Sequence, residues 1–402
     1  MRLAIRTTIQ TCSSSSSTSK PKSNPTSSPC KSPMLSWTQL KPQTAKYNNA
    51  PKLGTKWKQY QGINNWEGML DPLDDNLRWE ILRYGHFVDA TYHSCDFDSS
   101  MTYGTCRYSK NSLLRKCGLA HFGYRLTKNL NVTCGINLPS WIDKIYKHAR
   151  NRSSWIGYVA VCENKKEITR LGRRDVVIAL RGTITSLEWL ENLRATQTSL
   201  PGHIEDKENC PMVQKGFLSL YTSRTTHPSL QEMIREEIRR IIKSYHNEPL
   251  SLTLTGHSLG AALATLSAYD ITATFKNAPM ITVISFGGPR VGNKSFRKEV
   301  EHSGIRILRI VNSDDVITRI PGLLVNIDDD VAFNGDVHVA RLWRWLHRQV
   351  EDMQLVYADV GEELRLSSKE SMYIKNGDVG ACHDLKTYLH LVKCFVSSSC
   401  SY

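Results

Sequence analysis

A short turn with a serine at its centre joins an apolar, β-prone run to a helix-forming run in this chain. The run SLTLT precedes the turn Gly256-His257-Ser258-Leu259-Gly260, and AALATLSAYD follows it. A serine at such a bend holds a strained backbone, and side chains two residues before and after it would collide. Gly256 and Gly260 remove that collision. The pattern therefore predicts a strand, a sharp turn and a helix, with Ser258 at the edge of a sheet.

The position of Ser258 favours acyl transfer over a purely structural turn. Its hydroxyl is predicted to project from the strand end as a nucleophile, and the N–H of Leu259, at the helix start, is predicted to face an oxyanion. G-x-S-x-G alone is weak evidence, because a chain this long contains it by chance roughly one time in ten. The strand before the turn and the helix after it make the structural turn the less favoured interpretation.

Strand-like and helix-like segments alternate in the second half of the chain. Ser229 and Glu232 form a capping-box pattern at the head of an amphipathic helix over 230–245. Strands are expected at 154–162, 175–180, 251–255, 281–286 and 305–311, and further helices after Ser258 and at 294–302. This alternation predicts the α/β class, as an α/β hydrolase fold with a mostly parallel central sheet and right-handed crossovers from about residue 150 onward.

The first 150 residues are expected to be organised differently. A loop and a helix are expected over 66–98, with Asp71-Pro72 marking the helix entry, and 106–154 reads as irregular and polar. We therefore expect a leader over 1–60, a helical and irregular segment packing on the core over 61–150, the catalytic domain over 151–395 and a tail over 396–402.

The net charge of +14 comes mainly from an acid-free leader. Ten of the 52 basic residues and none of the 38 acidic residues precede Glu67, so a nucleic-acid partner loses its main support. Residues 1–40 hold eleven serines, a composition typical of an organelle transit peptide, with plastid favoured over mitochondrion. A plain disordered tail is the alternative. We expect a chloroplast protein, in the stroma or associated with a membrane, once the leader is removed.

A nucleophilic serine needs a base and an acid, which follow it in this fold in the order serine, acid, histidine. The acid should come after the strand at 305–311, where we favour Asp315, with Asp314 as the alternative. His383 is the best placed base, because it lies just before a helical stretch, where a loop residue can reach the sheet edge. The other histidines after the acid are His338, His347 and His390.

The second oxyanion donor is expected directly after the strand at 175–180, where the sequence reads Arg181-Gly182-Thr183. A glycine followed by a hydroxyl residue suits a backbone N–H aimed at the developing charge. The hydroxyl of Thr183 is a further donor. The sequence therefore predicts an oxyanion site between this loop and the N–H of Leu259.

The sequence gives little support for a metal site, an organic cofactor or a membrane-spanning segment. The eleven cysteines show no C-x-x-C pair and no zinc-finger spacing. No window approaches 18 uninterrupted apolar residues, so no membrane span is expected. We expect no metal and no organic cofactor, since a solvated acidic loop is favoured over a calcium site for Asp328-Asp329-Asp330. Trp343 and Trp345, among arginines, fit an interfacial membrane anchor and the core equally well.

Several motifs in order resemble the class 3 lipases. They are RGT at 181–183, GHSLG at 256–260, FGGPRVGN at 286–293, VNSDDVITRIPG at 311–322 and HDLKTYLHLV at 383–392. Together with WEGMLDPLDDNLRWEILRYG at 66–85 and LGRRDVVIALRGT at 171–183, they are similar to the plant plastid phospholipase A1 group. The resemblance covers nearly everything from Trp66 to Val392.

The resemblance implies Ser258 as nucleophile, Asp315 as orienting acid, His383 as base, and Thr183 with Leu259 as oxyanion donors. It also implies a lid helix within 184–195, whose apolar face would open onto lipid; a permanently packed helix is the alternative. That face would consist of Leu187, Trp189, Leu190 and Leu193. The implied activity is hydrolysis of the sn-1 ester of polar glycerolipids, phosphatidylcholine and galactolipids, in peripheral contact with a membrane, feeding jasmonate synthesis.

Two other functions stay open. One is a catalytically inactive signalling protein on a lipase scaffold, although such relatives generally carry a large helical domain after the hydrolase core and this chain runs about twenty residues past His383. The other is a triacylglycerol lipase or small-ester carboxylesterase. The sequence determines neither the head-group preference nor the oligomeric state.

Overall fold

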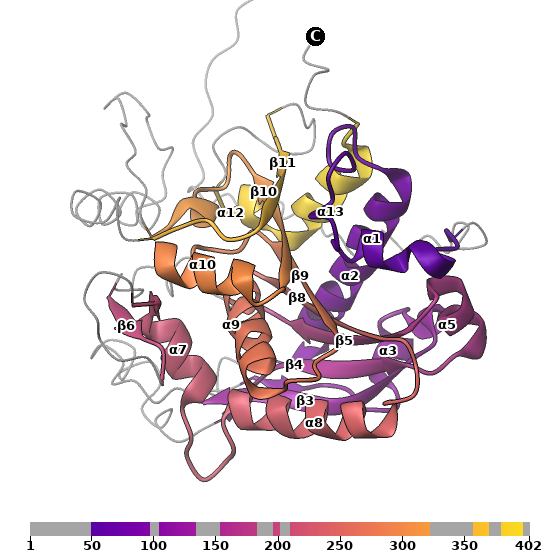
Figure 1. Ribbon diagram of the computed structural model, residues 1–402, viewed down its shortest axis with the longest axis horizontal. Helices are drawn as coiled ribbons and strands as arrows, with labels where there is room; N and C mark the ends of the chain where they lie inside the picture. The colour runs from indigo at the N-terminus through magenta and orange to yellow at the C-terminus, as the bar shows by residue number, and fades with distance from the viewer. Residues whose placement is uncertain are drawn as a thin grey trace, which may run out of the picture. The chain divides into compact units, whose positions relative to one another are not determined.

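The computed structural model describes residues 50–96, 104–133, 153–182, 196–201, 210–321, 357–369 and 379–396. All of these residues belong to one compact unit, Lys46–Tyr402, whereas a second unit, Met1–Ala45, lies outside the described residues. The described residues build a central sheet with helices on both of its faces (Figure 1).

The central sheet has seven strands in the order β11-β10-β9-β8-β5-β4-β3. Neighbouring strands from β11 to β5 are parallel, and β4 and β3 extend the sheet as an antiparallel edge. The mostly parallel sheet that the sequence predicts is therefore confirmed. The strands are β3 (Tyr124–Thr133), β4 (Ser153–Cys162), β5 (Arg174–Leu180), β8 (Leu250–His257), β9 (Met280–Phe286), β10 (Arg306–Asn312) and β11 (Glu362–Leu366).

Helices bury both faces of the sheet (Figure 1). One face packs against α7 (Lys215–Thr222), α8 (Leu230–Ser244), α9 (Leu259–Thr274) and α10 (Lys294–His302). The other packs against α1 (Trp57–Tyr60), α2 (Asp75–Ser94), α3 (Leu113–Lys116) and α13 (Leu385–Cys394). Successive side chains of a strand point to opposite faces, so in β5 Val176 and Ile178 join the first apolar core while Val177 and Ala179 join the second. This explains why β5 is apolar throughout.

The amphipathic helix α8 begins at the predicted capping box. Ser229 Oγ accepts a hydrogen bond from the N–H of Glu232 at 3.1 Å, and Glu232 Oε2 accepts one from the N–H of Ser229 at 2.9 Å. These two bonds satisfy backbone donors that a helix start leaves without intrahelical partners. The apolar stripe of α8, which includes Ile234 and Ile238, is buried against the sheet.

Two expectations for the N-terminal part are wrong. Residues 106–154 are not irregular throughout, because β3 is a ten-residue strand of the central sheet. Its register shifts at Leu126/Lys128 and Leu130/Asn131 break the two-residue periodicity that would reveal it in the sequence. Helix α2 begins at Asp75 rather than at Asp71-Pro72, since Asp74 is the cap whose carboxylate accepts from two backbone N–H groups at 2.9 Å.

Short elements complete the described fold. They are η3 (Gly54–Lys56), β1 (Cys95–Asp96), β2 (Thr105–Cys106), η4 (Ala120–Phe122), α5 (Lys165–Leu171), β6 (Gln197–Ser199), β7 (Met212–Gln214), η6 (Val316–Arg319) and α12 (Val379–His383). β1 pairs with β2, and β6 pairs with β7, each as a two-stranded antiparallel sheet. In the parts of the chain that the structure describes, no helix combines the length and apolar character needed to cross a bilayer.

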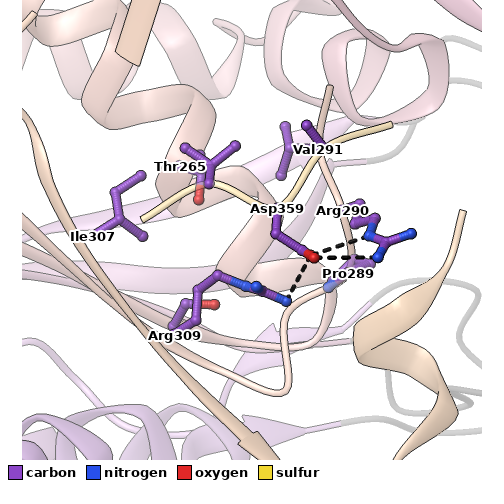
Figure 2. A pocket seen from close by; sticks show the side chains of 10 residues that line it. Thr265, Pro289, Arg290, Val291, Ile307, Arg309 and Asp359 are labelled. Atoms are coloured by element: carbon purple, nitrogen blue, oxygen red, sulfur yellow. Dashed lines mark hydrogen bonds and ion pairs between the residues drawn. The ribbon is translucent and has the colours of Figure 1, made fainter. Parts of the chain in front are cut away.

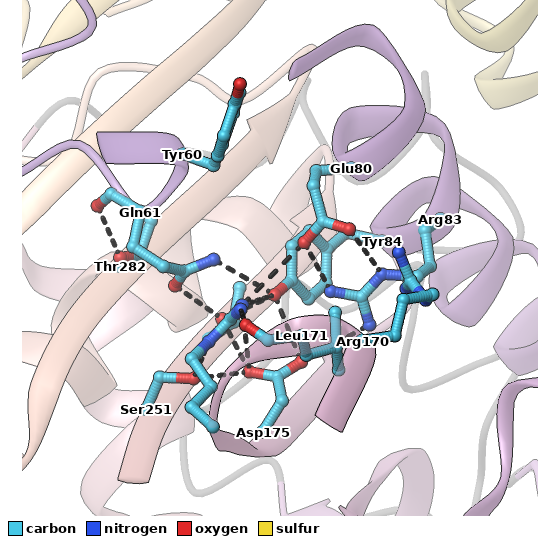
Figure 3. A network of polar contacts seen from close by, with 12 residues as sticks. Tyr60, Gln61, Glu80, Arg83, Tyr84, Arg170, Leu171, Asp175, Ser251 and Thr282 are labelled. Atoms are coloured by element: carbon cyan, nitrogen blue, oxygen red, sulfur yellow. Dashed lines mark hydrogen bonds and ion pairs between the residues drawn. The ribbon is translucent and has the colours of Figure 1, made fainter. Parts of the chain in front are cut away.

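A buried ionic cluster fastens α2 to the amino ends of β5 and β8 (Figure 3). Arg83 and Arg173 lie against Glu80 and Asp175, with N–O distances between 2.6 and 3.7 Å, and none of the four side chains is more than 2% exposed. Ser251 at the start of β8 donates to Asp175 at 2.7 Å. Burial alone would raise the pKa of Asp175, but the two guanidinium groups hold that pKa below its ordinary value. The charges of the cluster balance within the core.

Candidate active site

Ser258 forms the sharp turn between β8 and α9. Its φ of 55° and ψ of −124° lie in a region that side-chain-bearing residues rarely adopt. A Cβ added at Gly256 would lie 2.3 Å from the backbone of Gly260, and one added at Gly260 would lie 2.4 Å from the carbonyl oxygen of Leu180. Contacts this short are not tolerated, so both glycines have the steric role that the sequence predicts for them.

The parallel strands bring several loops to the carboxyl end of β8. Strand β8 lies between β5 and β9, with Gly256 opposite Leu180 and His257 opposite Phe286. The N–H of Ser258 donates to the carbonyl of Phe286 at 3.0 Å. A Cβ added at Gly182 would lie 3.0 Å from the Cβ of Ser258. The chain segment after β5 therefore contacts the serine directly.

His383 and Asp315 form a buried pair close to this strand end. His383 Nδ1 lies 2.6 Å from Asp315 Oδ2, and the side chains are 3% and 0% exposed. The other carboxylate oxygen of Asp315 accepts from the N–H of Ile317 at 2.9 Å. Because a carboxylate accepts at Nδ1, the proton of the neutral ring lies there and Nε2 is left as the base. Nε2 is buried and has no hydrogen-bond partner among the described residues.

His257, the residue before the serine, contacts His383 directly. His257 Nε2 lies 2.7 Å from the carbonyl oxygen of His383, and the two imidazole rings have centroids 4.8 Å apart. No hydrogen bond joins Ser258 Oγ to His383 Nε2 in this structure. Such bonds are often long in enzymes without substrate and tighten in the substrate complex. The three side chains expected to carry the chemistry therefore lie around one strand end.

The structure distinguishes the two acids that the sequence left open. Asp315 pairs with His383, as described above. Asp314 Oδ2 instead accepts hydrogen bonds of 2.8 Å from the N–H and the hydroxyl of Ser368. The geometry favours Asp315 as the orienting acid, and it gives Asp314 the role of holding the segment after β11.

Among the candidate bases, only His383 is shown beside an acid of this site within the described residues. It is the last residue of α12 rather than a loop residue, and the cap of α13, Asp384, follows it. His390 lies further along α13, with Nε2 3.9 Å from Cys394 Sγ. The remaining candidates, His338 and His347, lie outside the described residues.

Sequence reasoning missed Tyr388 and Asn312. The hydroxyl of Tyr388 donates to Asp315 Oδ2 at 2.6 Å and accepts from the N–H of Asn312 at 3.3 Å. Burial, and then the charge of Asp315, raise the pKa of Tyr388 far above its ordinary value, so the phenol keeps its proton. Asn312 Nδ2 donates to the carbonyl of Cys382 at 3.0 Å, directly before His383. The only sequence signal for Tyr388 is its place in the HDLKTYLHLV motif.

Of the two expected oxyanion donors, Leu259 lies within the described residues and Thr183 does not. Leu259 is the first residue of α9, where backbone N–H groups have no intrahelical acceptor. On the other side, Arg181 Nη1 donates to the carbonyl of Gly182 at 2.8 Å. Thr183 lies outside the described residues, and so do the expected lid residues, Leu187, Trp189, Leu190 and Leu193, together with the tryptophan and triple-aspartate segments. The expectations for all of these stay predictions.

A small cavity lies beside the FGGPRVGN motif (Figure 2). Its wall contains Asp359, which pairs with Arg290 at 3.1 Å and with Arg309 at 3.0 Å. Arg309 also donates to the carbonyl of Thr318 at 3.4 Å, in the turn after Asp315. The cavity volume is about 20 Å³, enough for one water molecule and far too small for an acyl chain. We conclude that this cluster of ion pairs stabilises the turn that contains Asp315.

Across the described segments, no group of three or more histidine, cysteine or acidic side chains is placed to hold a metal ion.

Comparisons with known proteins show which proteins this chain resembles. The family Lipase (class 3) matches residues 177–325, which contain Ser258 and Asp315. Phospholipase A(1) DAD1, chloroplastic, of Arabidopsis thaliana is 59% identical over 358 residues, which is 87% of this chain and 79% of that protein. Galactolipase DONGLE, chloroplastic, of the same plant is 38% identical over 85% of this chain and 70% of that protein. The crystal structure of a lipase from Rhizopus microsporus var. chinensis is 18% identical over 62% of this chain and 71% of that chain, with a TM-score of 0.42.

The plant relatives confirm both the resemblance and the predicted location. Each of the two is a chloroplast protein, as the Ser-rich, acid-poor leader of this chain predicts. The close relative covers more than two thirds of both chains. The chain belongs to the class 3 lipase family, in the group of the plant chloroplast phospholipases A1.

Proposed function

We propose that the protein is an acylhydrolase that cleaves the sn-1 ester of polar glycerolipids with Ser258 as nucleophile, His383 as base and Asp315 as orienting acid. One observation carries the proposal: a buried 2.6 Å pair of His383 Nδ1 and Asp315 leaves Nε2 unpaired, and the His383 carbonyl is bonded to His257, the residue before a strained, glycine-flanked serine. The substrate class follows relatives that are a phospholipase A1 and a galactolipase. Phosphatidylcholine and galactolipids are therefore the first substrates to test.

The reaction has two halves. Ser258 Oγ attacks the ester carbonyl while His383 Nε2 takes its proton, and Asp315 stabilises the resulting imidazolium through Nδ1–H. The carbonyl carbon then releases the glycerol oxygen, which receives the proton from Nε2, and the lysolipid leaves. In the second half Nε2 takes a proton from water, whose oxygen attacks the acyl carbon. The bond from that carbon to Ser258 Oγ then breaks, Oγ receives the proton from Nε2, and the fatty acid leaves.

Charge on the carbonyl oxygen develops in both halves. The N–H of Leu259 at the start of α9 supports one side of the oxyanion site, and we assign the other side to the N–H of Thr183. Each such donor is typically worth about a hundred- to a thousandfold in rate. We further propose a lid at 184–195, peripheral contact with the membrane, and a role for the released acyl chains in jasmonate synthesis.

The decisive experiment compares wild-type protein with Ser258→Ala on vesicles of phosphatidylcholine or galactolipid with different acyl chains at sn-1 and sn-2. We expect the wild type to release the sn-1 chain and leave the sn-2 lysolipid, and Ser258→Ala to release neither. Hydrolysis that survives in Ser258→Ala would refute the nucleophile.

The same assay separates the two other functions. A folded wild type that is inactive on every lipid would support the signalling protein. Turnover of short-chain esters without turnover of vesicle lipid would support a carboxylesterase, and faster turnover of triacylglycerol than of polar lipid would support a triacylglycerol lipase. A chelator such as EDTA is expected to leave the activity unchanged, because the proposed mechanism uses no metal.

A further inference from the structure

A hydrogen-bond chain links three parts of the site through two side chains outside the triad. The hydroxyl of Tyr92, in the last turn of α2, lies 2.7 Å from His257 Nδ1 and accepts from the N–H of Gly182 at 2.9 Å. His257 precedes Ser258, and its Nε2 lies 2.7 Å from the carbonyl oxygen of His383. The chain therefore runs from the loop after β5, past the nucleophile, to the backbone of the base.

The direction of every bond in this chain is determined by its ends. A carbonyl only accepts, so His257 Nε2 donates to the carbonyl of His383. A neutral imidazole with its proton on Nε2 has an acceptor at Nδ1, so the hydroxyl of Tyr92 donates there. The oxygen of Tyr92 is then free to accept from the N–H of Gly182. Each of the polar groups in the chain is satisfied, and only one arrangement of protons allows this.

Burial keeps this arrangement intact. His257 is 5% exposed, and burial, followed by the neighbouring His383, lowers the pKa of His257 well below its ordinary value. Burial raises the pKa of the Tyr92 phenol. The imidazole of His257 therefore stays neutral and the phenol of Tyr92 stays protonated near neutral pH. The donors and acceptors of the hydrogen-bond chain then stay the same while the reaction proceeds.

The backbone at the Gly182 end of the hydrogen-bond chain is closely packed. A Cβ at Gly182 would lie 2.6 Å from the oxygen of Tyr92 and 3.0 Å from the Cβ of Ser258. No side chain fits there, so the backbone after β5 is held against both groups. A displacement of about 1 Å between a nucleophile and the groups around it is enough to cost a large factor in rate.

We propose that Tyr92 and His257 are positioning residues, which fix the distance of the β5 loop and of the His383 backbone from Ser258. The inference rests on the proposed function of the triad. Neither side chain is expected to touch the ester. A residue that only positions the reacting groups affects the chemical step more than substrate binding, so its loss lowers kcat and leaves KM nearly unchanged.

Three variants test the proposal, assayed on dihexanoyl phosphatidylcholine below its critical micelle concentration. Tyr92→Phe removes one hydroxyl and is expected to lower kcat about tenfold, with KM within about twofold of wild type. His257→Leu removes both ring nitrogens and should lower kcat further. His257→Gln has a similar reach, with an N–H to donate and an oxygen to accept, and should recover at least about tenfold over His257→Leu.

Tyr158→Phe is the matched control. The hydroxyl of Tyr158 is also buried and also bonds to α2, at 2.9 Å from the carbonyl of Phe87, but it lies outside the chain. Its removal is expected to lower the thermal midpoint while kcat stays at the wild-type value. Equal losses of kcat in Tyr92→Phe and Tyr158→Phe would overturn the proposal, because they would point to stability alone.

The remaining outcomes are also decisive. A kcat within twofold of wild type in folded Tyr92→Phe, or equal kcat values for His257→Gln and His257→Leu, would overturn the proposal. If Tyr92→Phe does not fold, the two His257 variants decide the question by themselves. Failure of the proposed function looks different, because wild-type protein would then be no more active than Ser258→Ala.

Discussion

Tyr388 donates to the same oxygen of Asp315 that pairs with His383 Nδ1, and both distances are 2.6 Å. The second oxygen of the carboxylate is held by the N–H of Ile317 at 2.9 Å. Asp315 is completely buried, so its negative charge is supported by these protein groups. The carboxylate therefore has a single orientation, and it transmits that orientation to the imidazole of His383.

Tyr388→Phe should lower kcat about tenfold with little change in KM. The variant keeps the ring and its packing but removes a hydrogen bond to a charged group, and such bonds are worth about 1.5 to 3 kcal/mol. Only part of this free energy is expected to be lost from the stabilisation of the transition state, because His383 still pairs with Asp315. Steady-state kinetics on short-chain phosphatidylcholine measures the effect.

The control for Tyr388→Phe is Tyr269→Phe. The hydroxyl of Tyr269 bonds to Glu299 at 2.9 Å, between α9 and α10. This variant should keep the wild-type kcat. A loss of less than twofold in Tyr388→Phe would show that the hydroxyl contributes nothing to orienting the acid.

Asp315→Asn and Asp314→Asn should differ by orders of magnitude. Asp315→Asn leaves the shape of the site but allows the wrong tautomer of His383, a change that costs about ten-thousandfold in kcat in a serine protease with the same three residue types. Asp314→Asn weakens hydrogen bonds to Ser368 and should cost less than about tenfold. Near-UV circular dichroism establishes that both variants are folded. Similar losses in the two variants would contradict the assignment of the acid.

The parts of the site that are local in sequence could be predicted. The glycines around Ser258 follow from sterics within five residues, and the apolar run of β5 follows from burial on both faces. Asp315 and His383 were predicted from the order of the triad along the chain, with Asp314 left open because two adjacent carboxylates have the same local pattern.

The parts that depend on contacts between distant segments could not be predicted. Tyr92 meets His257 across 165 residues, and Tyr388 meets Asp315 across 73. Tyr92 is one of four aromatic residues, with Trp79, Tyr84 and Phe87, on α2, and no spacing sets it apart from those that only pack in the core. Tyr388 is the one tyrosine of α13, and nothing in its immediate neighbours indicates that its hydroxyl meets an acid 73 residues earlier. Strand β3 was missed for a different reason, because its bulges break the alternation on which strand prediction depends.

Asp175→Ala should lower the free energy of unfolding by about 3 to 5 kcal/mol. The substitution leaves Arg83 and Arg173 with Glu80 as their only carboxylate partner in the buried cluster (Figure 3), and an unpaired buried charge is strongly destabilising. Urea unfolding followed by tryptophan fluorescence measures the change. Because the cluster lies at the amino ends of β5 and β8, far along α2 from Tyr92, we expect the protein that remains folded to keep most of its kcat.

A matched exposed pair provides the control for Asp175→Ala. Arg297 and Glu301 lie 2.6 Å apart on α10 with side chains 51% and 46% exposed. Glu301→Gln should change the unfolding free energy by less than about 1 kcal/mol. Equal effects of the two substitutions would contradict the view that the buried cluster fastens α2 to the sheet.

His257→Gln should gain stability relative to wild type as the pH falls from 7 to 5.5. Because the pKa of His257 is lowered in the folded protein, the unfolded chain binds a proton below about pH 6.5 that the folded protein does not. Wild-type stability is then lost as the pH falls through 6.5, by up to about 1.4 kcal/mol per pH unit, and glutamine removes that loss. Urea unfolding at both pH values should show the difference between variant and wild type moving by about 1 kcal/mol in favour of the variant. Tyr158→Phe, which removes no group that titrates in this range, should keep a constant difference. If the difference in unfolding free energy between His257→Gln and wild type also stays constant, the folded protein accepts the proton on His257. That result would contradict the hydrogen-bond chain from Tyr92 to His383, in which Nδ1 of His257 is an acceptor.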